Sequence, residues 1–113
     1  MNVLNNMSAS NVSLKYQLLG PTLSPSTACA TGTSAIAESM HLIRDGIVDV
    51  MMVGGTEEII NPVILEACIK MGAMSRPEGK RDPEELSRPF DKSRNGFVLG
   101  EGSGVLIIEV HRL

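Results

Sequence analysis

Apolar residues recur at helical spacing between positions 30 and 45 and mark the clearest element of the chain. The repeating positions are Ile36, Met40, Ile43 and Ile47. Intervals of four, three and four residues place these side chains on one face of a helix. Charged residues lie on the other side, and Gly46 is a typical helix stop. The pattern therefore predicts an amphipathic helix over residues 30–45.

Two nearly continuous apolar runs predict strands. Residues 48–53 end at Gly54 and Gly55. Residues 96–110 are expected to return to a strand, in which the apolar run 105–108 follows three alternating glycines. A continuous run with β-branched residues is typical of a strand buried on both faces of a parallel sheet. The Ser/Thr-rich stretch 22–28 predicts a further strand in front of the helix. Strand, helix and strand would then form a right-handed βαβ unit.

The rest of the chain predicts two further helices and a long connection. Residues 1–19 have a ragged apolar face, and Gly20 followed by Pro21 stops them. Asn61 before Pro62 is a helix start, since Asn caps and Pro suits the first helical position. Residues 73–95 form an irregular connection with a helical turn at 82–85. No phosphate loop is predicted at Gly54 and Gly55, because the lysine and spacing of that motif are missing.

Composition places the chain among ordinary soluble globular proteins. It has 113 residues, enough for one small domain, and a formal net charge of -3. No marked basic patch favours nucleic-acid binding. Neither a signal peptide nor an apolar run long enough to span a bilayer is present. We therefore expect a reducing, cytoplasmic setting in which both cysteines are free thiols, an organelle remaining open.

Cys29 is the candidate nucleophile. It falls on the turn between the predicted strand 22–28 and the predicted helix, with small neighbours at Ala28, Ala30 and Gly32. The positive end of a helix dipole favours an anion there, so the thiol tends towards the thiolate that attacks carbonyl carbon. A buried cysteine that acts as a small apolar side chain is the alternative. The sequence predicts an acyl-transfer site in which Cys29 is the acyl carrier.

The other titratable candidates point to structural roles. Cys68 lies between apolar neighbours on a predicted helix and is expected in the core. His41 projects from the third turn of the nucleophile's own helix, too far along the axis to reach Cys29. His111 is expected to face solvent. Two cysteines and two histidines without ligand-like spacing predict no metal site, and no cofactor is predicted.

Four stretches in order now resemble one family. Residues 27–32 (TACATG) are similar to the active-site segment of the β-ketoacyl-acyl-carrier-protein synthases, the elongating condensing enzymes of fatty-acid and polyketide synthesis. Residues 49–57 (DVMMVGGTE), 88–91 (RPFD) and 96–102 (GFVLGEG) agree as well. The resemblance implies a thiolase-like layered α/β/α fold. Residues 1–113 would form part of the N-terminal half of that domain, without its C-terminal half.

The resemblance also implies roles and partners. Cys29 would take an acyl group from an acyl-carrier-protein thioester, and malonyl-carrier protein would lose carbon dioxide and attack the acyl-enzyme. Phe97 matches a phenylalanine that lines the substrate pocket beside the nucleophile. Homodimers are expected in the full-length parent. The cations Arg76, Lys80, Arg81 and Arg88 are either a solvated loop or a docking surface for an acidic carrier protein.

Departures from the family pattern limit these expectations. Two catalytic histidines normally stand in His-Gly-Thr and Gly-His motifs, and neither motif occurs in these residues. We therefore expect no condensation by the 113 residues alone. Asn95 stands where the pattern places an aspartate, which argues against an ionic role there. A non-catalytic remnant or a module that binds carrier protein or synthase is the alternative. A degradative thiolase is disfavoured by the 88–91 and 96–102 stretches.

Overall fold

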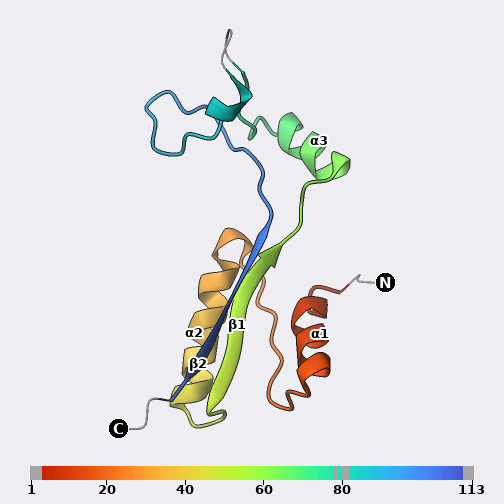
Figure 1. The fold of residues 1–113 in the computed structure, drawn as a ribbon, viewed down its shortest axis with the longest axis vertical. Helices are drawn as coiled ribbons and strands as arrows, with labels where there is room; N and C mark the ends of the chain where they lie inside the picture. Colours follow the sequence, from red (N-terminus) through yellow and green to blue (C-terminus); the bar gives the residue numbers. More distant parts are fainter. Residues whose placement is uncertain (1–3, 78, 80–81, 111–113) are drawn as a thin grey trace. The chain divides into compact units, whose positions relative to one another are not determined.

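The computed structural model describes residues 4–77, 79 and 82–110, and these fall into two compact units (Figure 1). The first unit comprises Met1–Thr56 and Ser103–Leu113, and the second comprises Glu57–Gly102. The first unit carries the candidate nucleophile, and the second carries the long connection and Phe97.

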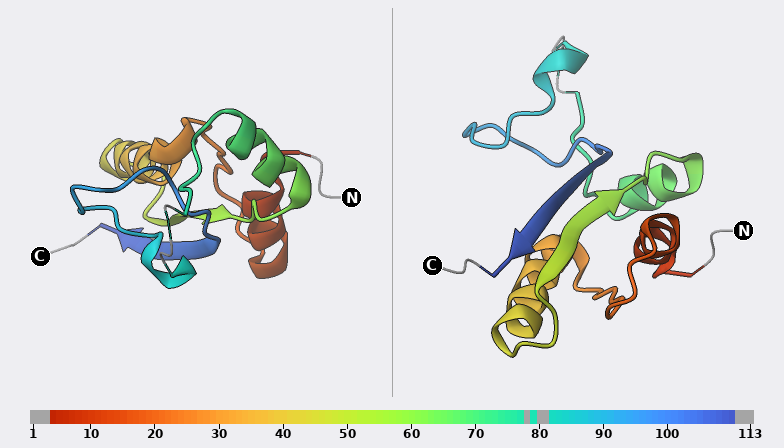
Figure 2. Two further views of the ribbon diagram at one scale, coloured as in Figure 1. Left: turned by 90° about the horizontal axis from the view of Figure 1, so that it is seen from above. Right: turned by 60° about the horizontal axis from the view of Figure 1, so that its bottom comes forward.

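The first unit is built around a two-stranded ribbon. Strands β1 (Val50–Glu57) and β2 (Gly102–Glu109) pair with each other, and helix α2 (Thr31–Arg44) runs alongside them (Figures 1 and 2). The Val110 N–H donates to the Asp49 carbonyl oxygen at 3.1 Å, while Gly54 lies against Gly104. The pairing partners thus run in opposite directions along the chain, so the ribbon is antiparallel.

The prediction of a βαβ unit is wrong. Residues 22–27 form neither a helix nor a strand, and a short 3-10 helix η1 (Ala28–Ala30) follows. The run 48–53 does form a strand, but its partner is the antiparallel β2 rather than a parallel neighbour. Continuous apolar sequence predicts a strand but leaves the direction of its partner open. Of the eight residues of β1, only Val53 is buried within the described chain.

Helix α2 lies where it was predicted, and its most buried face differs from the predicted one. Ser39 is 4% exposed, whereas Met40 is 60% exposed. A Cβ on Gly55 of β1 would lie 3.7 Å from the Gly32 Cα, so helix and strand approach closely at small residues. Small side chains therefore face the ribbon, and the long Met40 side chain points elsewhere.

Helix α1 (Met7–Tyr16) is shorter than the predicted helix over 1–19. Gln17 adopts a left-handed conformation with φ of 53° and donates its N–H to the Ser13 carbonyl oxygen. This cap ends the helix before Gly20 is reached. The Ser24 hydroxyl donates to the Asn5 carbonyl oxygen at 3.0 Å, which ties the segment after α1 back to its start.

The second unit contains helix α3 (Pro62–Lys70) and the short 3-10 helix η2 (Pro83–Glu85). Helix α3 begins and is capped at Asn61 and Pro62 as predicted, and η2 lies in the helical turn predicted at 82–85. Asn61 Oδ1 accepts the N–H groups of Val63 and Ile64 at 3.1 and 3.0 Å. The Glu84 N–H donates to Asp82 Oδ1 at 3.2 Å. Helix α3 contains no buried residue within the described chain.

Glycines mark two close backbone approaches. Gly54 and Gly55 lie inside β1 rather than after it, and a Cβ on Gly54 would overlap the Gly104 carbonyl oxygen. Gly96 has φ of 147°, and a Cβ there would lie 2.5 Å from the Ser75 nitrogen. The predicted strand over 96–110 is therefore formed only from Gly102 onward, and Phe97 instead makes an isolated parallel bridge with Met74.

Candidate active site

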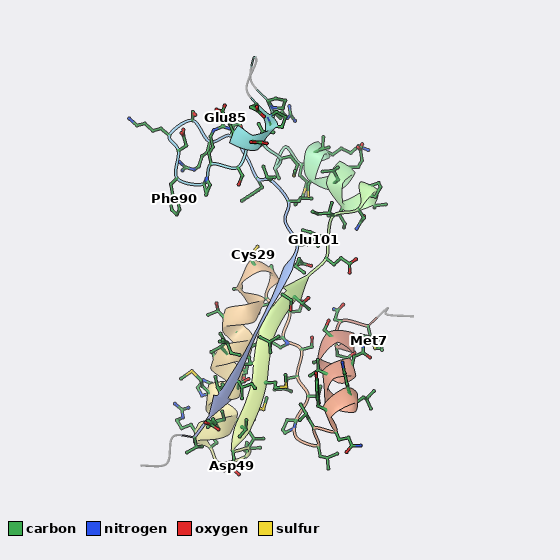
Figure 3. The ribbon with its side chains drawn as sticks, in the orientation of Figure 1. Met7, Cys29, Asp49, Glu85, Phe90 and Glu101 are labelled. Carbon is green, nitrogen blue, oxygen red and sulfur yellow. The ribbon has the colours of Figure 1, made fainter. Side chains whose placement is uncertain are left out.

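Cys29 lies on the turn that leads into α2. It occupies the middle of η1 (Ala28–Ala30), directly before the helix starts at Thr31. Its side chain is exposed and its thiol is free, and Figure 3 shows it at the N-terminal end of α2. The first turn of α2 has no acidic residue. The positive end of the helix dipole therefore lies at this turn, and no acidic side chain in the first turn of α2 offsets it.

Ala28, the residue before Cys29, has an unusual backbone. Its φ is 50°, in the left-handed region that alanine rarely adopts. A residue held in such a conformation persists only where its surroundings enforce it, and such residues cluster at functional sites. The turn under the thiol is therefore a strained element with a defined direction.

Hydroxyl groups hold this turn. The Thr31 hydroxyl donates to the Ala28 carbonyl oxygen at 2.7 Å and accepts the Thr27 N–H at 3.0 Å. The hydroxyls of Thr27 and Ser34 lie 2.8 Å apart in a third hydrogen bond. The small neighbours of Cys29 were predicted from the sequence, whereas these hydroxyl groups were not. A Thr two residues after the cysteine and a Ser five after it were the available signal.

Neither the second cysteine nor the two histidines belong to this turn. Cys68 on α3 is a free thiol and is only half-buried, so the prediction that it lies in the core is wrong. His41 is exposed as predicted, and Arg44 Nη2 lies 2.6 Å from its Nδ1. His111 lies outside the described residues. Among the described residues, no group of three or more His, Cys, Asp or Glu side chains is placed to hold a metal ion.

Phe97, the predicted pocket residue, lies in the second unit. Its side chain is 71% exposed, and its backbone forms hydrogen bonds with the first and the last residue of the segment 73–75. The Phe97 N–H donates to the Ala73 carbonyl oxygen, and its own carbonyl accepts the Ser75 N–H, both at 2.8 Å. Cys29 belongs to the other unit, so the pocket shared by these two residues stays a prediction.

Asn95 fixes the two ends of the long connection to each other. Its Oδ1 accepts the Ser75 hydroxyl at 2.6 Å, and its Nδ2 donates to the Arg76 carbonyl oxygen at 2.9 Å. These bonds lie two residues before Phe97. Sequence reasoning noted the residue type at this position but did not find its partners.

Arg88 organises the loop within the connection. Its guanidinium donates to the Ser93 carbonyl oxygen at 2.7 and 3.2 Å and to the Glu85 carbonyl oxygen at 3.1 Å. This cation is therefore committed to the loop's own backbone. Lys80 and Arg81, also named as docking cations, lie outside the described residues. The docking surface stays a prediction.

Glu101 joins the two ends of the second unit. Its Oε1 accepts the Ile60 N–H at 2.8 Å, directly before the Asn61 cap of α3. Figure 3 labels Glu101 just before the start of β2. No helix in the described part of the chain is long and apolar enough to cross a membrane.

Comparison with known families gives a match over nearly the whole chain. The profile of the family described as "Beta-ketoacyl synthase, N-terminal domain" matches residues 1–112. The mitochondrial 3-oxoacyl-[acyl-carrier-protein] synthase of Arabidopsis thaliana is 43% identical over 107 residues, which cover 95% of this chain and 23% of that protein. The 3-oxoacyl-[acyl-carrier-protein] synthase 2 of Rhizobium meliloti is 42% identical over 94% of this chain and 25% of its own length. The chain thus spans about a quarter of the curated relatives it matches.

Solved structures give the same result. One similar chain comes from the complex of a type II polyketide synthase acyl-carrier protein with its ketosynthase bound to the hexaketide. It has a TM-score of 0.85 and 34% identity, over 90% of this chain and 25% of that chain. A β-ketoacyl synthase from Burkholderia phymatum has a TM-score of 0.81 and 34% identity, over 94% of this chain and 25% of its own.

Proposed function

Since this chain belongs to the β-ketoacyl synthase N-terminal domain family, we propose that Cys29 is the acyl-accepting nucleophile of a β-ketoacyl-acyl-carrier-protein synthase. The fold is part of the thiolase-like α/β fold of the ketosynthases it matches. One observation carries the proposal: Cys29 is an exposed, free thiol on a strained turn at the N-terminus of α2. That placement exposes the thiol to a substrate and lays it at the positive end of the α2 helix dipole.

The first step is a thioester exchange. The Cys29 thiolate attacks the carbonyl carbon of an acyl thioester on the carrier protein, and a tetrahedral oxyanion forms. The carbon–sulfur bond to the carrier then breaks, the acyl group stays on Cys29, and the carrier thiolate takes up a proton from water. Backbone N–H groups at the turn are suited to the oxyanion, since they are fixed before the reaction starts.

The second step forms the carbon–carbon bond. Malonyl-carrier protein loses carbon dioxide, and the electron pair left behind attacks the acyl carbonyl carbon on Cys29. The Cys29 thiolate leaves, and the product is a β-ketoacyl thioester on the carrier protein. Phe97 is proposed to line the pocket that takes the acyl chain. Acyl-carrier protein is the proposed partner, and a homodimer is proposed for the full-length parent.

The two steps make different demands on these residues. Acylation needs a reachable thiolate and an oxyanion site, both of which the turn can supply. Decarboxylation needs groups that stabilise the developing carbanion, and the resemblance assigns this to histidine motifs absent from these 113 residues. We therefore propose residues 1–113 as part of the N-terminal half of the synthase domain, competent for acylation at Cys29 but not for condensation.

The acylation step is tested with an acyl thioester of N-acetylcysteamine and peptide mass spectrometry. The full chain is expected to gain one acyl group on Cys29, with Cys68 modified much more slowly because it is half-buried. The Cys29→Ser variant should lose the thioester adduct, and Cys68→Ser should keep it. Equal labelling of both cysteines, or labelling of Cys68 alone, contradicts the assignment.

The condensation step is tested by release of carbon dioxide from malonyl-carrier protein. No turnover is expected from the 113 residues alone. Turnover above that of the Cys29→Ser variant would contradict the proposal that these residues support acylation but not condensation. Binding of carrier protein without acylation of Cys29 would instead favour a non-catalytic, carrier-binding module.

A further inference from the structure

We propose that Thr31 is a positioning residue whose hydroxyl holds the Ala28 backbone in its strained conformation and thereby aims Cys29. The inference rests on the proposed role of Cys29 as acyl acceptor. In this scheme the Thr31 side chain contacts neither the Cys29 thiol nor the acyl thioester that reacts with it. It acts through the peptide unit that joins Ala28 to Cys29.

Thr31 makes three hydrogen bonds to the two residues before Cys29. Its hydroxyl donates to the Ala28 carbonyl oxygen at 2.7 Å, and its own N–H donates to the same oxygen. The hydroxyl oxygen also accepts the Thr27 N–H at 3.0 Å. A hydroxyl is the smallest group that can donate and accept at once, and both capacities are used here.

These bonds fix the direction of the cysteine. Because the peptide bond is planar, the direction of the Ala28 carbonyl also sets the direction of the Cys29 N–H and the position of its Cα. The φ of 50° at Ala28 is unfavourable for any residue with a Cβ, so it needs such an outside restraint. Loss of the hydroxyl would let Ala28 relax toward negative φ and turn the thiol away from its present direction.

A purely helix-stabilising role for Thr31 is the competing explanation. Thr33 provides a matched control, since it lies in the same first turn of α2 and is exposed. Its hydroxyl makes no hydrogen bond within the described part of the chain. Thr and Val have nearly equal helix propensities, so Thr→Val changes helix stability little at either position.

The experiment measures the rate of Cys29 acylation by the N-acetylcysteamine thioester in the full chain, with Cys68 as the internal reference. Thr31→Val is expected to slow Cys29 acylation about tenfold, the effect of losing a hydroxyl that both donates and accepts. Thr31→Ser keeps the hydroxyl and should stay within about twofold, as should Thr33→Val. Far-UV circular dichroism confirms that each variant retains its helices.

A double variant tests the strain directly. Glycine adopts positive φ without cost, so Ala28→Gly combined with Thr31→Val should recover at least half of the lost rate on a logarithmic scale. Equal rates for Thr31→Val and Thr33→Val would overturn the inference. So would a double variant no faster than Thr31→Val alone.

Failure of the proposed function gives a different result. If wild-type Cys29 is not acylated at all, the acyl-acceptor role falls, whatever the state of Thr31. Alkylation by iodoacetamide then reports on the turn alone. A change of threefold or more in the Cys29 rate relative to Cys68 in Thr31→Val, absent in Thr33→Val, supports the positioning role, and no change refutes it.

Discussion

Two adjacent glycines in β1 should respond to alanine in opposite ways. A Cβ on Gly54 would overlap the Gly104 carbonyl oxygen and lie 2.9 Å from the Val105 Cα. A Cβ on Gly55 would meet only the Gly32 Cα, at an ordinary contact distance of 3.7 Å. Both residues lie in the same strand, so strand propensity changes equally in the two variants.

The size of the difference follows from these contacts. Ordinary Cβ contacts begin at 3.4 Å. To admit Gly54→Ala, the Val105 Cα would have to move by 0.5 Å, and the Gly104 carbonyl oxygen, which is closer, would have to move further. The obstacle is backbone on the paired strand, which cannot rotate away as a side chain can. Overpacking of this kind costs about 1–3 kcal/mol. Gly55→Ala should instead stabilise by about 0.4–1 kcal/mol, because the unfolded chain loses freedom.

Urea unfolding of the full chain, followed by far-UV circular dichroism, measures both effects. The two variants should differ by about 1.4–4 kcal/mol, so with a urea dependence of about 1–2 kcal/mol per molar for a small protein the midpoints should differ by about 1–4 M, Gly54→Ala being the lower. Gly104→Ala is a second control, since a Cβ there meets nothing within 4 Å. Equal midpoints for Gly54→Ala and Gly55→Ala would show that the strands are not this close.

Further changes test the local anchors of the second unit. Asn61→Ala removes the acceptor for two N–H groups of α3 and should lower the free energy of unfolding by about 1 kcal/mol, while Asn61→Asp should lower it by less, both read from urea midpoints. Arg88→Lys keeps the charge but loses the forked bonds to the carbonyls of Ser93 and Glu85. Amide hydrogen exchange in residues 82–95 should therefore quicken in Arg88→Lys, and unchanged exchange would show that the fork is not needed.

Local signals in the sequence were sufficient to predict where α3 begins and where α2 ends, but not the end of α1. The Asn61 and Pro62 pair predicted the start of α3, and Gly46, with φ of 70°, followed the end of α2 as expected. Burial on α2 was harder to predict, because the helix meets the strand at Gly32 and buries Ser39. Such a contact depends on how closely two backbones approach, and a hydrophobic pattern contains no information about that distance.

Strand pairing could not be predicted from local sequence signals in the same way. The stretch 22–28 has the Ser and Thr content of a strand, but a strand exists only when a neighbour supplies the other half of its hydrogen bonds. Its last residue, Ala28, turns into η1 with positive φ instead. The cysteine at the start of a helix was therefore predictable from residue types, whereas the strained turn that directs it was not.

Asn95 shows how the structure changes the meaning of a residue type. The family resemblance places an aspartate there, and the sequence alone could say only that an ionic role is absent. The side-chain amide accepts from Ser75 and donates to the Arg76 carbonyl oxygen, so it uses both of its ends. A carboxylate could accept from Ser75 but would face the Arg76 carbonyl without a proton to share. Since Phe97 follows two residues later and bridges to Met74, a neutral amide at this position helps to fix the backbone that carries the proposed pocket residue.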